Sequence, residues 1–184
     1  FGNVGSNTAR ILCEELSMKC IGIGDHTTYI HNELGFDIAD VLQYNNKYRH
    51  IKGYTDELKL TKKKTKEEFF SIKTTIVIPA ALELQILGDL APKLQCELVV
   101  EGANGPLDID ADKILMEKGI DVIPDVLANA GGVAVSYFEW LQNQRRESWS
   151  LETVKYKLGM MMTDAYHNVN KLSLDQQISK RQAA

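Results

Sequence analysis

Four short apolar runs alternate with longer amphipathic segments along most of the chain. The runs are CIGIGD (20–25), TTIVIPA (74–80), ELVVEGA (97–103) and DVIPDV (121–126). They are rich in β-branched residues and apolar on both faces, which is typical of strands in a parallel sheet covered by helices. Helical patterns occupy 6–19, 81–90 and 111–118, and Asp108 or Asp110 can serve as an N-cap for the last of these. The alternation predicts an α/β fold, a Rossmann-like, doubly wound and mostly parallel sheet with helices on both faces.

The pattern changes near Gly131. GGVAVSYFEWLQNQRRESW (131–149) and LETVKYKLGMMMTDAYHNV (151–169) read as two successive helices with no strand between them. We therefore expect a domain over 1–145 and a C-terminal helical segment over 146–184.

Composition excludes several function classes. The net charge is −4, so we expect no general attraction to nucleic acid or to an anionic membrane. No apolar run is long enough to cross a bilayer. The four histidines and three cysteines lack metal-ligand spacing, so no metal site is predicted, and no G-x-S-x-G elbow is present. The charged run KLTKKKTKEE (59–68) is most simply a solvated surface stretch.

The opening stretch FGNVGSNTAR places Gly2 and Gly5 at the spacing of the last two glycines of G-x-G-x-x-G, directly before a helical pattern. Such glycines let the backbone approach a pyrophosphate at a helix N-terminus. The alternative is a glycine pair that merely precedes a helix. Asp25 ends the next strand at roughly the ~20-residue spacing of that fingerprint, where a carboxylate accepts ribose hydroxyls and repels a 2′-phosphate. NAD is therefore favoured over NADP, although Asp25 could also be an ordinary turn residue.

Asparagines occur in the turns after two strands, in EGANGP (101–106) and ANAGGV (128–133). Asn104 and Asn129 would lie at the carboxyl ends of their strands, where ligands bind in open α/β sheets. An asparagine side chain matches a carboxamide such as that of nicotinamide, but Asn-Gly is also ordinary turn chemistry. Ala80 and Ala81 end a third strand and are small enough to let the backbone approach a planar ring.

FGNVGSNTA, IVIPAALELQI, VVEGANGPLDIDADKIL and IPDVLANAGGVAVSYFEW together resemble successive signatures of the glutamate/leucine/phenylalanine/valine dehydrogenase family. They are most similar to the NAD(P)-binding domain of the members that act on glutamate. The resemblance implies backbone contacts to the pyrophosphate from Asn3 and Val4, and an adenine ribose held by Asp25. It implies that Ala80 and Ala81 line the cofactor cleft, that Asn104 and Asn129 hold the nicotinamide ring and its ribose, and that Val133 and Ser136 bind substrate.

Ser136 indicates the substrate within that resemblance. Members acting on apolar amino acids carry an apolar residue there, and an unpaired buried hydroxyl costs about 1–3 kcal/mol. L-Glutamate is therefore the expected substrate, although Ser136 could simply line a helix. The implied reaction is oxidative deamination to 2-oxoglutarate and ammonia with NAD(P).

The resemblance also implies that parts of the family's fold lie outside this chain. The family's catalytic lysine and aspartate belong to an N-terminal domain, and the first strand precedes the glycine turn. We therefore expect a truncated first strand, no catalytic residue in this chain and no turnover by the chain alone. The 146–184 segment would pack back toward the catalytic domain. The full-length enzyme would be a hexamer, cytoplasmic or mitochondrial.

Two other functions remain open from the sequence. One is a non-catalytic NAD-binding regulatory or interaction module. The other is a different Rossmann-type enzyme, against which the two asparagine turns followed by an aromatic helix argue.

Overall fold

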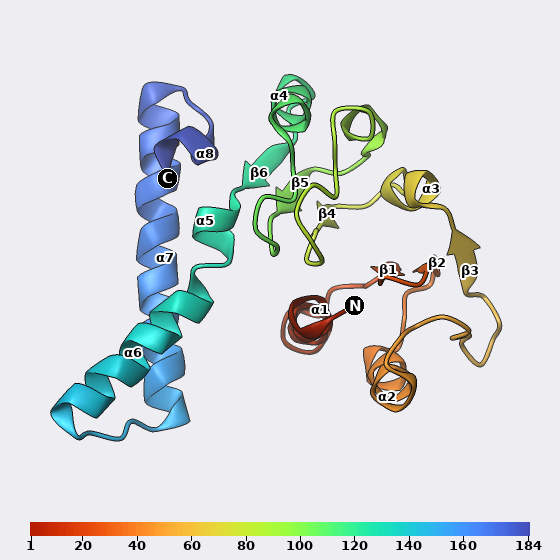
Figure 1. The fold of residues 1–184 in the computed structure, drawn as a ribbon. Helices are drawn as coiled ribbons and strands as arrows, with labels where there is room; N and C mark the ends of the chain where they lie inside the picture. The colour runs from red at the N-terminus through yellow and green to blue at the C-terminus, as the bar shows by residue number, and fades with distance from the viewer.

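The computed structural model describes residues 1–184, the whole chain (Figure 1). It is an α/β fold with small sheets. The strands are β1 (Gly22–Gly24), β2 (Tyr29–His31), β3 (Lys62–Lys64), β4 (Ile76–Val77), β5 (Leu98–Val100) and β6 (Asp121–Ile123). The helices are α1 (Asn3–Leu16), α2 (Ile38–Tyr48), α3 (Lys66–Phe70), the 3₁₀ turn η1 (Ala91–Lys93), α4 (Ile109–Glu117), α5 (Asp125–Ala128), α6 (Gly131–Arg145), α7 (Leu151–Gln176) and α8 (Lys180–Ala183).

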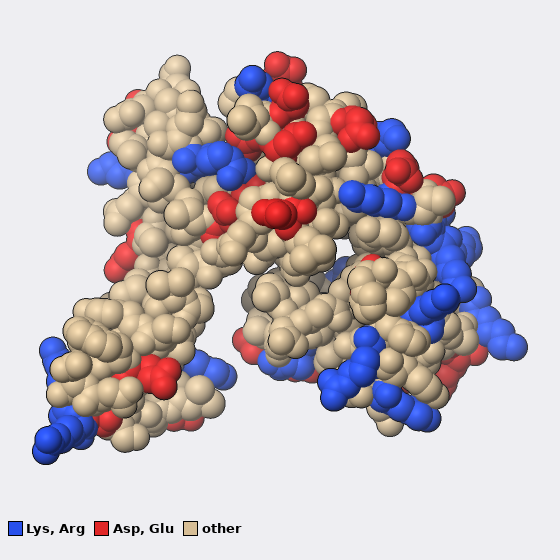
Figure 2. Space-filling model, in the orientation of Figure 1, with Lys and Arg blue, Asp and Glu red and all other residues tan.

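The first sheet is antiparallel, in the order β1-β2-β3. Helix α3 contacts β2 and β3, and residues of α1 and α2 belong to the same hydrophobic core as β1 and β2. This core includes Ile30 and, from the segments around α2, Val41 and Ile51, all of which are almost fully buried. The predicted surface run contains β3, whose three residues are lysines. Figure 2 shows Lys and Arg gathered on this side of the molecule. Lysines suit an edge strand, because their charge discourages pairing with another chain.

The second sheet is parallel, in the order β4-β5-β6. It shares a core with α4 and η1, in which Ile86, Val99 and Leu115 have no exposed surface. Asp108 is the N-cap of α4, and its carboxylate accepts a hydrogen bond from the backbone N–H of Ala111 at 2.7 Å. The predicted helix over 111–118 is thus confirmed, with its start two residues earlier.

The sheet arrangement differs from the expectation of one mostly parallel sheet. All four predicted runs contain a strand, but only β4, β5 and β6 pair in parallel. The strand from the first run, β1, pairs with β2 in an antiparallel ladder, and the sequence analysis predicted neither β2 nor β3. β1 and β4 are both edge strands, so the two sheets share no hydrogen-bonded strand pair.

The helix predicted over 81–90 is wrong. The segment instead runs beside the turn that follows β5, where the N–H groups of Leu84 and Ile86 donate to the carbonyls of Gly105 and Pro106 at 2.9 Å. Leu84 has a left-handed backbone with φ of 53°, which is incompatible with an α-helix. Pairing with a distant segment therefore outweighs the local helical pattern.

The C-terminal helices are confirmed as α6 and α7, which pack against each other (Figure 1). The C-terminal end of α6 and the N-terminal end of α7 lie away from both sheets, at the lower left of Figure 1. The short helix α8 returns from the end of α7 and contacts β6. None of the helices combines the length and the apolar character that crossing a membrane requires.

Candidate dinucleotide site

The glycine turn forms the start of α1. Gly2 is the N-cap residue, and no side chain caps this end of the helix. The first N–H groups of a helix have no partner within it, so the N–H groups of Asn3, Val4 and Gly5 point outward and carry the positive end of the helix dipole. No acidic residue lies in the first turn to neutralise them. This end of α1 is therefore suited to an anion.

The end of β1 lies against the same turn. The backbone nitrogen of Phe1 donates to the carbonyl of Gly24, one residue before Asp25. Asp25 and the start of α1 are thus neighbours, as the fingerprint predicts.

The Asp25 carboxylate is already engaged in the protein. Its Oδ1 accepts hydrogen bonds from the N–H of Thr27, the hydroxyl of Thr27 and the N–H of Thr28, at 2.7, 2.6 and 3.0 Å. Its Oδ2 accepts one bond from the N–H of Ile51, at 2.7 Å. A carboxylate has about four acceptor positions, so Oδ2 retains about one. That leaves less capacity than the two ribose hydroxyls expected from the sequence would require.

These contacts determine the charge state of Asp25. Desolvation raises the pKa of the carboxyl, but the hydrogen bonds from Thr27, Ile51 and Thr28 outweigh it and hold the pKa below its usual value. The residue is therefore an anion at neutral pH.

Small residues bring α1 against the ends of β4 and β5. A Cβ placed on Gly102 would lie 3.2 Å from Cβ of Ala80 and 3.5 Å from Cγ1 of Val4. A Cβ placed on Gly5 would lie 3.8 Å from the same Ala80 atom. Ala81, the next residue, is exposed. Because Gly102 has no side chain, α1 and the segments after β4 and β5 can meet at the carboxyl ends of these strands.

The two predicted asparagines are brought together. The Nδ2 of Asn129 donates to the Oδ1 of Asn104 at 2.6 Å, across the ends of β5 and β6. Asp125 supports both turns, because its Oδ2 accepts from the N–H of Gly105 at 2.8 Å and its carbonyl accepts from the N–H of Asn129 at 2.9 Å. Asn104 is exposed and Asn129 is partly exposed, so their free donors and acceptor are open to a ligand.

The two predicted substrate residues lie on α6, which starts two residues after Asn129. Val133 is 76% exposed. Ser136 is also exposed, and its hydroxyl donates to the carbonyl of Gly132 at 3.2 Å, one turn earlier in the helix. Neither belongs to the buried residues of α6, which are Ala134 and Phe138.

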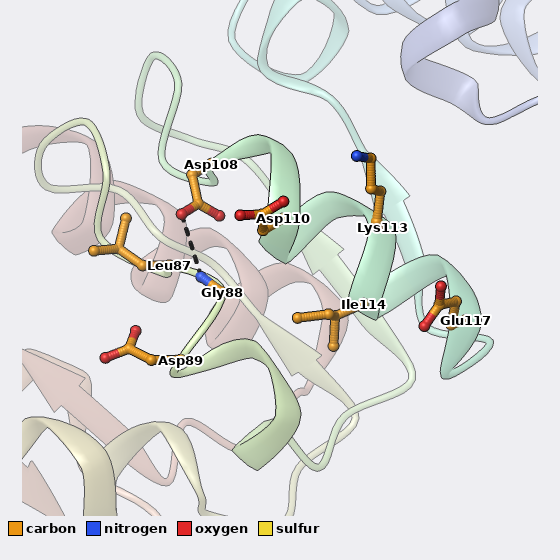
Figure 3. Close-up of a pocket in the computed structure, with 8 residues that line it drawn as sticks. All are labelled: Leu87, Gly88, Asp89, Asp108, Asp110, Lys113, Ile114 and Glu117. Carbon is orange, nitrogen blue, oxygen red and sulfur yellow. Dashed lines mark hydrogen bonds between the residues drawn. The ribbon is translucent and has the colours of Figure 1, made fainter.

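One open surface depression, beside the start of α4, contains none of these residues. Figure 3 shows that its lining includes four acidic residues, Asp89, Asp108, Asp110 and Glu117, and one basic residue, Lys113. The N–H of Gly88 donates to Asp108 at 3.3 Å. The depression is open and acidic, which disfavours a phosphate-bearing ligand. The candidate site is therefore the strand-end region rather than this depression.

Sequence reasoning missed two residues beside the site. Glu101 follows β5 and is completely buried, and Arg181 of α8 binds its carboxylate at 2.6 Å. An acid at the end of the apolar run ELVVEGA was the available signal for the first. No local pattern identified Arg181, because its partners are far away in the sequence.

Comparison with known proteins places the chain in a family. The sequence profile of the Glutamate/Leucine/Phenylalanine/Valine dehydrogenase family matches residues 1–184. Glutamate dehydrogenase of Thermotoga maritima is 39% identical over 184 residues, which are 100% of this chain and 43% of that protein. NAD-specific glutamate dehydrogenase of Staphylococcus aureus is also 39% identical, over 100% of this chain and 43% of that protein. NADP-specific glutamate dehydrogenase A1 of Halobacterium salinarum is 38% identical over 169 residues, 90% of this chain and 39% of that protein.

A solved structure agrees with these relatives. The hetero-hexameric glutamate dehydrogenase of Thermus thermophilus, in a leucine-bound form, superposes with a TM-score of 0.87 at 28% identity, over 100% of this chain and 42% of that chain. The chain thus spans about 40% of the length of the proteins it matches. The profile match over its full length shows that the chain belongs to the Glutamate/Leucine/Phenylalanine/Valine dehydrogenase family.

Proposed function

We propose that the chain is the cofactor-binding domain of an amino-acid dehydrogenase that oxidatively deaminates L-glutamate to 2-oxoglutarate and ammonia with NAD(P). The observation that carries the proposal is a continuous row of neighbouring groups along the strand ends. Asp25 follows Gly24, whose carbonyl bonds Phe1 just before α1. Gly5 and Val4 of α1 lie beside Ala80 and Gly102 at the ends of β4 and β5. The turn after Gly102 carries Asn104, which is bonded to Asn129 at the end of α5. Such a row suits a long ligand with a phosphate near its middle.

The chemistry of the row matches a pyridine dinucleotide in order. The uncapped N-terminus of α1 donates backbone N–H groups to the pyrophosphate, at the place where Gly2 leaves open space. The amides of Asn104 and Asn129 offer the donors and acceptor that a carboxamide and a ribose require. When bound, the nicotinamide supplies the carbon that accepts a hydride from Cα of the amino acid. The residues of this chain hold and orient that ring.

We propose NAD as the preferred cofactor. The relatives include both NAD-specific and NADP-specific enzymes, so family membership leaves the choice open. The Asp25 carboxylate is ionised beside the proposed ribose position, where it opposes the charge of a 2′-phosphate. Its remaining acceptor position on Oδ2 suits one ribose hydroxyl.

We propose that Val133 and Ser136 form one wall of the substrate pocket. Both are exposed on α6 and follow closely after Asn129. The Ser136 hydroxyl bonds only a helix carbonyl, at 3.2 Å, so it can turn to donate to the side-chain carboxylate of L-glutamate. We propose that the family's catalytic lysine and aspartate belong to another domain, so we expect no turnover by this chain alone.

The proposal extends to the fold. We propose that β1 and β4 are the two neighbours of a further strand ahead of Phe1. Each of them has an unpaired edge, and the backbone nitrogen of Phe1 already donates to the carbonyl of Gly24 at the end of β1. Such a strand would join the two sheets into the Rossmann-like arrangement expected for 1–145. We also propose that 146–184 faces the catalytic domain of a full-length, hexameric enzyme.

A fluorescence titration of the chain with NADH tests this function. We expect enhanced NADH fluorescence, tighter binding than with NADPH, and roughly tenfold weaker NADH binding in Asn129→Ala. Asn168→Ala, an exposed asparagine on α7, is the matched control and should bind like the wild type. Absence of NADH binding by the folded wild-type chain, or equal losses in both variants, contradicts the proposal. Glutamate-dependent NADH formation by the isolated chain would contradict the assignment of the catalytic groups to another domain.

A further inference from the structure

A buried carboxylate lies directly behind the asparagine pair. Glu101 has no exposed surface. Its Oε2 accepts a hydrogen bond from the N–H of Asp125 at 2.8 Å, and both of its oxygens accept from the Arg181 guanidinium, at 2.6 and 3.2 Å. A carboxylate removed from water needs this degree of pairing, because an unpaired buried charge is strongly unfavourable.

The bonds continue from Glu101 to the proposed nicotinamide position. Glu101 fixes the N–H of Asp125, and Asp125 holds the N–H of Gly105 at 2.8 Å and the N–H of Asn129 at 2.9 Å. Gly105 is adjacent to Asn104, whose amide oxygen accepts from Asn129 at 2.6 Å. The relative position of the two amides thus depends on hydrogen bonds that begin at Glu101.

The cation of this network comes from the other end of the chain. Arg181 lies on α8, and its guanidinium also contacts Asp112 of α4 at 3.1 Å and Asp125 at 3.7 Å. Arg181 is thus the cation that binds three carboxylates, one from the turn after β5, one from α4 and one from α5. Its neighbour Lys180 binds Asp121 of β6 at 2.7 Å and so fastens α8 to the sheet without touching Glu101.

We propose that Arg181 is a positioning residue for the nicotinamide end of the site, acting through Glu101 and Asp125 on the Asn104–Asn129 pair. This inference rests on the function proposed above. The planar guanidinium binds both oxygens of Glu101 and so fixes the direction of the carboxylate, which a lysine ammonium would not do. The C-terminal segment thereby controls one half of the dinucleotide site, while the pyrophosphate half depends on α1 and the strand ends alone.

The test compares two probes, NADH and ADP-ribose, by isothermal titration calorimetry of the full chain. ADP-ribose carries the adenosine and pyrophosphate but lacks the nicotinamide. In Arg181→Gln we expect the Kd of NADH to rise roughly tenfold and the Kd of ADP-ribose to stay within about twofold. Lys180→Gln is the matched control, since it removes the ion pair between α8 and Asp121 of β6 but leaves the Arg181–Glu101 pair in place. It should leave both Kd values within about twofold of the wild type.

Two further variants keep the test decisive. Glu101→Gln combined with Arg181→Gln removes the unpaired charge and retains an amide oxygen for the N–H of Asp125, so NADH affinity should return to within about threefold of the wild type. If Arg181→Gln does not fold, judged by circular dichroism, Arg181→Lys replaces it and should show the same selective loss of NADH binding.

The outcomes separate the two proposals. Unchanged NADH binding in Arg181→Gln, equal loss of both probes, or the same loss in Lys180→Gln would overturn the positioning role. If the folded wild-type chain binds neither probe, the proposed function fails first.

Discussion

Gly2→Ala separates a glycine needed for folding from a glycine needed for ligand binding. A Cβ on Gly2 would meet no protein atom within 4 Å. The backbone of Gly2 has φ of −89° and ψ of −160°, which alanine adopts without strain. The protein itself therefore gives no reason for a glycine at this position, whereas a pyrophosphate approaching the N–H groups of α1 would occupy that space.

The expected stability change is close to zero. Alanine is a poorer N-cap than glycine, which costs about 0.5–1 kcal/mol, and it reduces the freedom of the unfolded chain, which contributes about 0.4–1 kcal/mol in the opposite direction. The net change in the free energy of unfolding should lie within about 0.5 kcal/mol. Urea denaturation followed by circular dichroism measures it.

Ligand affinity should respond very differently. We expect the Kd of ADP-ribose to rise at least roughly tenfold in Gly2→Ala, which is about 1.4 kcal/mol. The matched control is Gly159→Ala, because Gly159 also has no neighbour within 4 Å and lies exposed in the middle of α7. It should raise stability by about 1 kcal/mol and leave the Kd unchanged. Unaltered ADP-ribose binding in Gly2→Ala would refute a phosphate at the start of α1.

Three other variants test the contacts of the site and core. Gly102→Ala should lower the free energy of unfolding by about 1–3 kcal/mol in urea, because the new Cβ would lie 3.2 Å from Ala80 and 3.5 Å from Val4; a stability equal to the wild type would contradict that packing. Asp25→Asn should reduce the preference for NADH over NADPH in competition titrations, and an unchanged preference would count against the ribose assignment. The pKa of the Asp25 carboxyl is lower in the folded than in the unfolded state, so the wild type should lose the stability that Asp25 contributes as the pH falls below about 4. The thermal midpoint of the wild type should therefore fall more steeply on acidification than that of Asp25→Asn, and parallel falls would contradict this. Leu115→Ala should lower the free energy of unfolding by about 2–5 kcal/mol, because Leu115 is fully buried. A urea midpoint equal to that of the wild type would contradict the placement of Leu115 in the core beside the parallel sheet.

The parts of the fold that depend on local pattern were predictable. The four apolar runs each contain a strand, and the amphipathic segments before and after them form α1, α4, α6 and α7. Strands buried on both faces and helices with one apolar face leave a strong local signal.

The parts that depend on distant partners were not predictable. The segment 81–90 has helical periodicity, but its backbone pairs with the turn around Gly105 and Pro106. The pairing of β1 with β2 is likewise set by a turn and a lysine-rich strand that the sequence presents only as a charged run. Hydrogen bonds between remote segments outweigh propensities of less than about 1 kcal/mol per residue.

The candidate site shows the same division. The sequence predicted the places of Gly2 before a helix and of Asp25 and Asn129 after strands, because turn residues at element ends leave a local signal; their ligand contacts stay predictions. The engagement of Asp25 by Ile51 was not predicted, because that donor arrives from the loop after α2. Arg181 was missed for the same reason, since only the folded chain brings α8 to Glu101.

The central claim is that one dinucleotide lies along the strand ends, with phosphates at α1 and the nicotinamide at the asparagine pair. Titration of ¹⁵N-labelled chain with ADP-ribose and then with NADH, followed by two-dimensional NMR, tests it most directly. We predict that both ligands shift the backbone amides of Asn3, Val4 and Gly5, and that only NADH shifts the side-chain amides of Asn104 and Asn129. Shifts confined to other surfaces, such as the acidic depression around Asp108, or identical shifts of the two asparagine side chains with both ligands, would contradict the account.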